Sequence, residues 1–144
     1  MAHTAAERFA DFVVSADVPP AAREAAQTAF LDTVGVTLAG AVEPAAIAVQ
    51  QVAAEEGGDA RCRILGTPHR TGACFAALAN GTAAHALDYD DMCFVSLAHP
   101  SAPLVAATLA AGELTAAPGR ALLDAYVVGF EIEAVLGRAM NPRH

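Results

Sequence analysis

The chain has 144 residues, of which 55% are hydrophobic and 17% charged, so it is one ordinary domain in length and more apolar than the usual soluble balance of roughly 45–50% and about 25%. Its formal net charge is −8, and all eight basic residues are arginine. This negative field repels phosphates and anionic lipid, so we expect neither nucleic acid nor a membrane as a partner.

The first part of the chain predicts three helices. Thr4 and Glu7 have the spacing of a capping box, in which a hydroxyl and a carboxylate satisfy free backbone amides at a helix start. Prolines, which are tolerated in a first helical turn, open the second and third segments, and glycines close them. The expected helices lie at about 4–15, 20–39 and 44–56.

The middle of the chain begins with its only strand signal. Residues 61–65, RCRIL, alternate polar and apolar side chains before a Gly-Thr-Pro turn, which predicts a short extended segment. Thr71 is the expected cap of the alanine-rich helix that follows and reaches the acidic stretch 88–91. The poor helix propensity of Asn80-Gly81 suggests a bend or close packing within that helix.

Two more helices follow after an irregular loop. Ser101 is the expected N-cap of the first, which ends near Leu114. The second runs over about 119–140 and is ended by Asn141-Pro142. The chain has no repeat of fixed period and no long linker, so we expect residues 1–144 to form one all-α helical bundle.

The cellular compartment follows from the cysteines and the apolar runs. The three cysteines form no CxxC pair, and the N-terminus lacks the charged and apolar regions of a signal peptide. The longest apolar run contains Asp124, Glu131 and Glu133, whereas a membrane span needs about 20 nearly uncharged residues. We expect a cytoplasmic protein, and we do not expect Cys93 to be catalytic, because the neighbouring acids disfavour a thiolate.

Residues 85–101, HALDYDDMCFVSLAHPS, bring three acids and two histidines into an otherwise apolar region. Helical spacing places His85 and Asp88 one turn apart on one face. His99 stands just before a helix N-terminus, whose positive field favours a neutral imidazole, while a nearby carboxylate favours a charged one. The sequence leaves that balance open, and it makes Asp88 and His99 the candidate acid/base pair.

Two other interpretations of these residues stay open. A His-Pro-Ser segment is often only a turn, and acids at a helix end are often solvated or cap the next segment. Histidine and carboxylates also bind metals. A calcium loop starting at Asp88 fails, because Cys93 and His99 stand where glycine and glutamate are required, and Asp90-Asp91 does not continue into a DDxxD magnesium motif. We expect no metal and no cofactor.

Four segments of the chain resemble the N-terminal third of the MmgE/PrpD family: LDTVGVTLAGA (31–41), NGTAAHALDYDDM (80–92), LAHPSAPLVAATLAAGE (97–113) and GFEIEAVLGRAMNPRH (129–144). Its members include 2-methylcitrate dehydratase, cis-aconitate decarboxylase and iminodisuccinate epimerase. The resemblance implies a large helical domain, a lid domain formed by later sequence, and a homodimer. It also implies cofactor-free dehydration, decarboxylation or epimerisation of a small di- or tricarboxylate.

The resemblance also implies roles for individual residues. Asp88 and His99 match active-site positions of the decarboxylase-like members, where Asp88 would orient or share a proton. His99 would act as acid/base or bind a substrate carboxylate. Three further residues are expected to bind substrate: His85, Asp91 and Ser101.

Two departures from the family pattern limit what the resemblance implies. Met92 stands where many relatives have threonine, which leaves the choice of substrate open. Relatives also continue beyond the equivalent of His144 into segments that supply a lysine, another histidine and a tyrosine. A carboxylate substrate needs cationic or amide donors, and this chain has no lysine. We therefore expect an incomplete site, inactive alone and completed by further sequence or a partner chain; the alternative is a non-catalytic dimerisation or partner-binding module.

Overall fold

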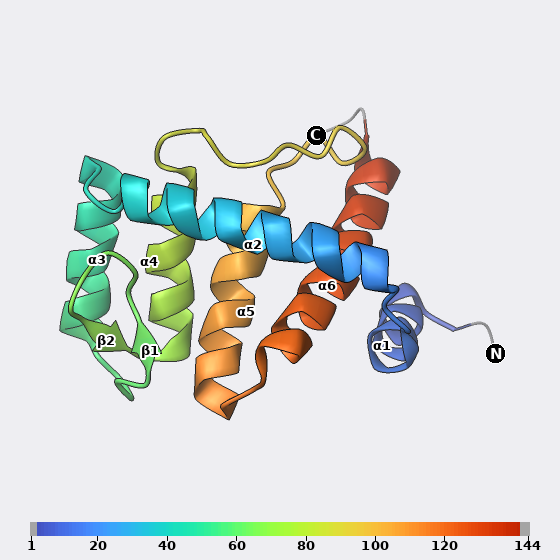
Figure 1. The fold of residues 1–144 in the computed structure, drawn as a ribbon, viewed down its shortest axis with the longest axis horizontal. Coiled ribbons are helices and arrows are strands. Elements are labelled where there is room, and N and C mark those ends of the chain that lie inside the picture. The colour runs from blue at the N-terminus through green and yellow to red at the C-terminus, as the bar shows by residue number, and fades with distance from the viewer. Residues whose placement is uncertain (1–2, 142–144) are drawn as a thin grey trace.

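A computed structural model of the chain describes residues 3–141, which form six helices and one small hairpin (Figure 1). The predicted all-α class is confirmed, and the extended segment predicted at 61–65 is the first strand of the hairpin. The elements are α1 Ala5–Ser15, α2 Pro20–Gly40, α3 Pro44–Glu56, β1 Cys62–Arg63, β2 Arg70–Thr71, α4 Ala73–His85, α5 Ser101–Thr115 and α6 Gly119–Met140.

Helix α4 is the centre of the arrangement, because it packs against α2, α3 and α5. Helix α2 crosses in front of α4, α5 and α6 and contacts all three (Figure 1). The face of α4 is built from small side chains, and Ala76, Ala79 and Ala83 are at most 1% exposed. Where α2 crosses α4, a Cβ on Gly40 would overlap the carbonyl of Ala83, so the crossing depends on glycine.

A polar residue inside α4 ties the hairpin to the bundle. Asn80 is buried; its Oδ1 accepts a hydrogen bond from the Leu65 amide at 2.8 Å, and its Nδ2 donates to the Arg63 carbonyl at 3.0 Å. Helix α4 passes through Asn80-Gly81 without a break, and of the two expectations for this pair, a bend or close packing, close packing is the one observed. The residue of low helix propensity is there because its amide pairs with the hairpin backbone.

The helix caps partly follow the predictions. The capping box of α1 is confirmed, with the Glu7 amide bonded to Thr4 Oγ1 and the Thr4 amide bonded to Glu7 Oε2. The prediction that Thr71 caps α4 is wrong, because Gly72 occupies the N-cap position. Thr71 belongs to β2 and is fully buried, and its hydroxyl proton is shared between the carbonyls of Ala53 and Gly57, which lie 2.9 and 2.6 Å from Oγ1.

The end of the chain is described only to Asn141, which is the C-cap of α6. Pro142, predicted to end this helix, lies outside the described residues. Among residues 3–141, no single helix has both the length and the apolar character needed to cross a bilayer; α2 and α3 meet that test only as a pair bent by 91°.

The loop of residues 86–100 joins the end of α4 to the start of α5 (Figure 1). An antiparallel bridge between Cys93 and Ala98 closes its outer part, with a backbone hydrogen bond of 2.9 Å. Its tip packs on the C-terminal end of α6, where a Cβ on Gly137 would overlap Ser96. The loop is thus held at both ends and at its tip, and it carries most of the acids and histidines singled out in the sequence.

Candidate active site

The site begins where α4 ends. His85 is the last residue of α4, and three residues later Asp88 adopts a φ of 55°, in the left-handed region. Aspartate enters this region more readily than most residues, but it still carries strain there. The left-handed turn reverses the chain, so that Asp90 comes back to the imidazole of His85.

Asp90 lies between the two histidines. Its side chain is 0% exposed, and its two oxygens lie 3.0 and 3.1 Å from Nδ1 of His85. Nδ1 of His99 is 3.5 Å from Asp90 Oδ1, and the two imidazole rings meet edge to face with centroids 4.9 Å apart. With Asp90 ionised, Nδ1 of His85 carries the proton, and Nε2 is left free to accept one.

The two predicted catalytic residues come together. Oδ1 of Asp88 is 3.8 Å from Nε2 of His99, close enough for an ion pair and longer than a hydrogen bond. The Asp88 side chain is 79% exposed and that of His99 is 28% exposed. Nδ1 of His99 is buried and has no hydrogen-bond partner among the described residues. The imidazole therefore retains unused hydrogen-bonding capacity, while the catalytic roles themselves stay predictions.

A groove of about 800 Å³ runs beside these residues, between α3, α4 and α5. Both His85 and His99 line it, and Thr82 adds a hydroxyl. The rest of the lining is mainly small and apolar and includes Leu78 and Pro103. A pocket of this kind, with few polar groups on an apolar wall, is the common setting for a small-molecule site.

Asp91 and Ser101 bond to each other. Both Asp91 oxygens accept hydrogen bonds, Oδ1 from the Ser101 amide at 3.0 Å and Oδ2 from Ser101 Oγ at 2.7 Å. Oγ of Ser101 also lies 2.6 Å from the hydroxyl of Tyr126. The prediction that Ser101 is the N-cap of α5 is wrong: Pro100 holds that position, Ser101 is the first helical residue, and Asp91 supplies the acceptor that satisfies its amide. Whether Asp91 and Ser101 bind substrate stays a prediction.

Three groups near this network have pKa values that differ from their ordinary values. It raises the pKa of Tyr126 and that of Glu133, and the negative charge of Asp91 raises both further. Hydrogen bonds from Ser96 lower the pKa of Cys93, because they stabilise the thiolate more than the charge of Asp91 destabilises it. The pKa of Cys93 is therefore lowered overall, so the expectation that the thiolate is disfavoured is wrong, although the charge of Asp91 does act against it.

The same histidines and acids are also a candidate metal site. One ligand atom from each of His85, Asp88, Asp90 and His99 can be chosen so that all four lie within 4.8 Å of one another. The donor set of two imidazoles and two carboxylates suits a borderline divalent ion such as Zn²⁺. Metal ligands about 2.0–2.2 Å from the ion lie closer to each other than 4.8 Å, so binding would require these side chains to draw together.

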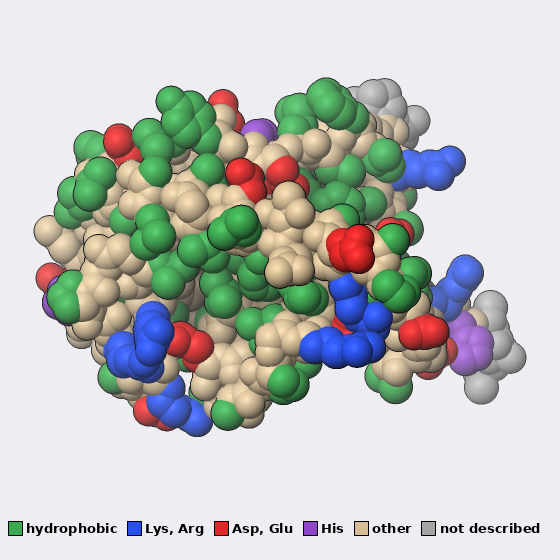
Figure 2. Space-filling model, in the orientation of Figure 1, with side chains coloured by type: hydrophobic (Ala, Val, Ile, Leu, Met, Phe, Trp, Pro, Cys, Tyr) green, Lys and Arg blue, Asp and Glu red, His purple; other side chains and the backbone are tan. Residues whose placement is uncertain are grey.

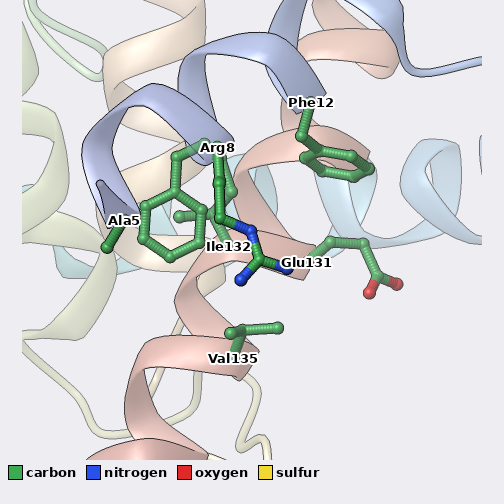
Figure 3. A pocket seen from close by; sticks show the side chains of 7 residues that line it. Ala5, Arg8, Phe12, Glu131, Ile132 and Val135 are labelled. Carbon is green, nitrogen blue, oxygen red and sulfur yellow. The ribbon is translucent and has the colours of Figure 1, made fainter. Parts of the chain in front are cut away.

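A second groove, of about 410 Å³, lies between α1 and α6 (Figure 3). The side chains of Arg8 and Phe12 extend across it from α1, and Ile132 and Val135 face it from α6 (Figure 3). Its described lining includes one arginine and one glutamate, but none of the histidines or aspartates above. It therefore offers an apolar surface without the acid/base groups of the first groove.

Two residues of the site did not emerge from the sequence as site residues. Asp90 is the buried carboxylate between the histidines, yet in the sequence it is one of three neighbouring acids with nothing to distinguish it. Its position two residues after Asp88 is the only signal. Tyr126 lies on α6, 25 residues from Ser101, and no local motif connects the two.

Comparison with known proteins identifies a family for the chain. A family model described as the MmgE/PrpD N-terminal domain matches residues 7–144, which include all of the cluster and the groove. A search of curated proteins returned no match. The match covers nearly the whole chain and includes the His85–Ser101 segment, and the chain therefore belongs to the MmgE/PrpD family through its N-terminal domain.

Proposed function

We propose that this chain supplies the proton-transfer part of an MmgE/PrpD-type lyase site that acts on a small di- or tricarboxylate. The observation that carries the proposal is the approach of Asp88 Oδ1 to His99 Nε2 at 3.8 Å, with His99 on the wall of an 800 Å³ groove. A base must come within hydrogen-bond reach of the proton it removes, and distances in a free site are often longer than in the complex.

The proposed chemistry is proton removal or delivery at a carbon next to a carboxylate group. His99 Nε2 takes or gives this proton, and Asp88 orients the imidazole or shares the proton with it. Asp90, buried behind the ring at 3.5 Å from Nδ1, stabilises the imidazolium that forms and holds the ring in place. Dehydration, decarboxylation and epimerisation all contain such a step, and the proposal does not choose among them.

The charge of the substrate requires a further contribution. Asp88 and Asp90 repel a carboxylate, and none of the ion pairs in residues 3–141 brings an arginine to the histidine cluster. Anionic substrates are held by cationic or amide donors. We propose that further sequence, a second copy or a complementary chain supplies these donors across the groove.

The test uses the enzyme assembled with its remaining parts. Asp88→Asn and His99→Ala are each expected to lower kcat by about 100-fold or more, as loss of a general acid or base does, while circular dichroism shows the same helix content. The matched control is His69→Ala, which removes an exposed imidazole from the hairpin turn and is expected to keep normal turnover. Normal turnover in both site variants would eliminate the proposed roles.

A divalent metal is a second candidate for this site, favoured by the four-residue ligand cluster. Elemental analysis of the purified chain, followed by Zn²⁺ titration of the chain and of His85→Asn, decides it. One equivalent of Zn²⁺ that is lost in His85→Asn and kept in His69→Asn would support a metal site. Absence of tight binding in the unmodified chain would remove this candidate.

The non-catalytic alternative is a module for dimerisation or partner binding. Hydrophobic side chains are scattered over the face that contains α2 (Figure 2). Leu31 on α2 and Val42 shortly after it are 76% and 72% exposed. Phe94 on the 86–100 loop is 80% exposed. Scattered exposed apolar residues are normal on monomeric proteins, so the alternative requires that a partner covers these side chains together. Sedimentation of the chain tests this: a stable monomer that binds no co-encoded chain would count against the alternative.

A further inference from the structure

We propose that Tyr126, Ser101 and Asp91 form a hydrogen-bonded clamp that positions Asp90 and His99 for catalysis, rather than contacting substrate themselves. The inference rests on the proposed function, because it assigns a supporting role in that same site. It gives Tyr126, on a different helix from every predicted site residue, a part in the reaction through its effect on the 86–100 loop.

The direction of each hydrogen bond in the clamp follows from the groups involved. An ionised Asp91 can only accept, so Ser101 Oγ donates its single proton to Asp91 Oδ2 at 2.7 Å. Ser101 Oγ must then be the acceptor in its 2.6 Å bond with the Tyr126 hydroxyl. The Ser101 amide also donates to Asp91 Oδ1 at 3.0 Å. Both oxygens of the Asp91 carboxylate therefore accept hydrogen bonds from within the protein.

Burial fixes the clamp to the core. Ser101 is 0% exposed and Tyr126 is 5% exposed. The Tyr126 ring packs edge to face on Phe30 at 5.5 Å between centroids and lies 6.0 Å from Phe130. Burial raises the pKa of Tyr126, so its hydroxyl stays a neutral donor at physiological pH. A donor that is rigid and always protonated suits a positioning role.

The clamp lies between the two residues that it is proposed to position. Its hydrogen bonds join Asp91, within the 86–100 loop, to Ser101, the first residue of α5. Asp90 immediately precedes one end of the clamp, and His99 lies two residues before the other. The contact of 3.5 Å between Asp90 Oδ1 and His99 Nδ1 is not itself a hydrogen bond, so it depends on how the two residues are held by their other partners. His85 holds the Asp90 side chain, and the clamp holds the backbone next to both residues.

The test uses the 144-residue chain with labelled histidine imidazoles, whose ring signals report their surroundings in NMR spectra. Tyr126→Phe removes one hydroxyl and keeps the packed ring, so we expect the helix content to be unchanged while the His99 ring signal shifts. Ser101→Ala removes both hydroxyl bonds and is expected to shift the His85 and His99 signals further. The matched control is Tyr89→Phe, which removes the same hydroxyl from a residue that is 72% exposed.

The result that overturns the clamp is a spectrum of Tyr126→Phe in which the His85 and His99 signals coincide with those of the unmodified chain. In the assembled enzyme, Tyr126→Phe is expected to lower kcat by about 10-fold with little change in KM, the pattern of a misplaced acid/base group. If His99→Ala abolishes turnover and Tyr126→Phe changes neither kcat nor the signals, the clamp proposal is wrong and the proposed function stands. If His99→Ala turns over normally, the proposed function fails, whatever the spectra show.

Discussion

Two polar clusters, one in the middle of helix α4 and one at its C-terminal end, are satisfied to very different degrees. In its middle, Asn80 is buried, and its amide oxygen and nitrogen are both hydrogen-bonded to the hairpin backbone. At its end, His85 meets Asp90 and His99, where Nδ1 of His99 is buried without a partner and the contacts to His99 are 3.5 and 3.8 Å. The two clusters lie on one helix, five residues apart at Asn80 and His85.

The difference separates a structural polar group from one available for chemistry. A buried polar group that has all its partners stabilises the fold, whereas one that lacks them costs free energy. The same loop also holds Asp88 in a left-handed conformation, which adds strain. Unsatisfied hydrogen-bonding groups and backbone strain beside a groove lower stability, and both are typical of functional sites.

The largest effect on stability is expected at the satisfied group. Asn80→Ala leaves the Leu65 amide and the Arg63 carbonyl without their partner, so we expect the free energy of unfolding to fall by about 3 kcal/mol. Urea denaturation of the chain measures this. The comparison variant is His99→Ala, which is expected to cost under about 1 kcal/mol because Nδ1 of this imidazole is buried without a hydrogen-bond partner among the described residues. Equal losses in the two variants would contradict the distinction.

The second prediction concerns the packing of α2 against α4 between Asn80 and His85. Gly40 crosses α4 at Ala83, between Asn80 and His85, where a Cβ would overlap backbone. Gly40→Ala is expected to destabilise the chain by about 2 kcal/mol through overpacking. Gly35→Ala, on the same helix with open space around it, is expected to stabilise by up to about 1 kcal/mol through helix propensity. Opposite shifts in thermal melting temperature are therefore expected.

The third prediction measures the strain at the site. Asp88→Gly places a residue that tolerates positive φ at this turn, so we expect a gain of about 0.5 kcal/mol in unfolding free energy. The matched variant is Ala116→Gly at the C-cap of α5, where φ is 53° and the gain is expected to reach about 1 kcal/mol. Only Asp88→Gly is expected to remove activity from the assembled enzyme. A loss of stability in both variants would show that these turns carry no strain.

How much of this comparison is readable in the sequence depends on how local each feature is. The helices, the capping box of Thr4 and the first strand follow from patterns within a few residues, and the structure contains them. The convergence of Asp88 and His99 was also expected, because a helix end and a helix start flank one loop. Two other features were not readable, because their partners come from distant parts of the chain: the bonds of Asn80 and the Tyr126–Ser101 contact. The second strand pairs locally with the first, but its two residues are too few to show an alternating pattern.

The smallest effect is a contrast between two glutamates in the pH dependence of stability. Hydrogen bonds from Thr4 lower the pKa of Glu7, whereas burial and the charge of Asp91 raise that of Glu133. The ordinary value for both is 4.5. Glu133 therefore holds its proton in the folded state after the unfolded state has lost its own, and the chain loses stability as the pH rises above 4.5. Glu7 gives the opposite: its stabilisation is present above 4.5 and is lost as the pH falls through its lowered pKa.

Chemical denaturation between pH 3 and 8 of Glu133→Gln and Glu7→Gln separates the two. Relative to the unmodified chain, Glu133→Gln is expected to become more stable as the pH rises above about 4.5. Glu7→Gln is expected to become less stable, relative to the unmodified chain, as the pH rises from the lowered pKa of Glu7 to about 4.5. Below the lowered pKa of Glu7 both differences are expected to be constant, because both carboxyl groups are then protonated in either state. A Glu133→Gln difference that does not change with pH would show that this carboxyl group is as well solvated as a surface glutamate, and that the polar network around Asp91 adds no electrostatic strain to the fold.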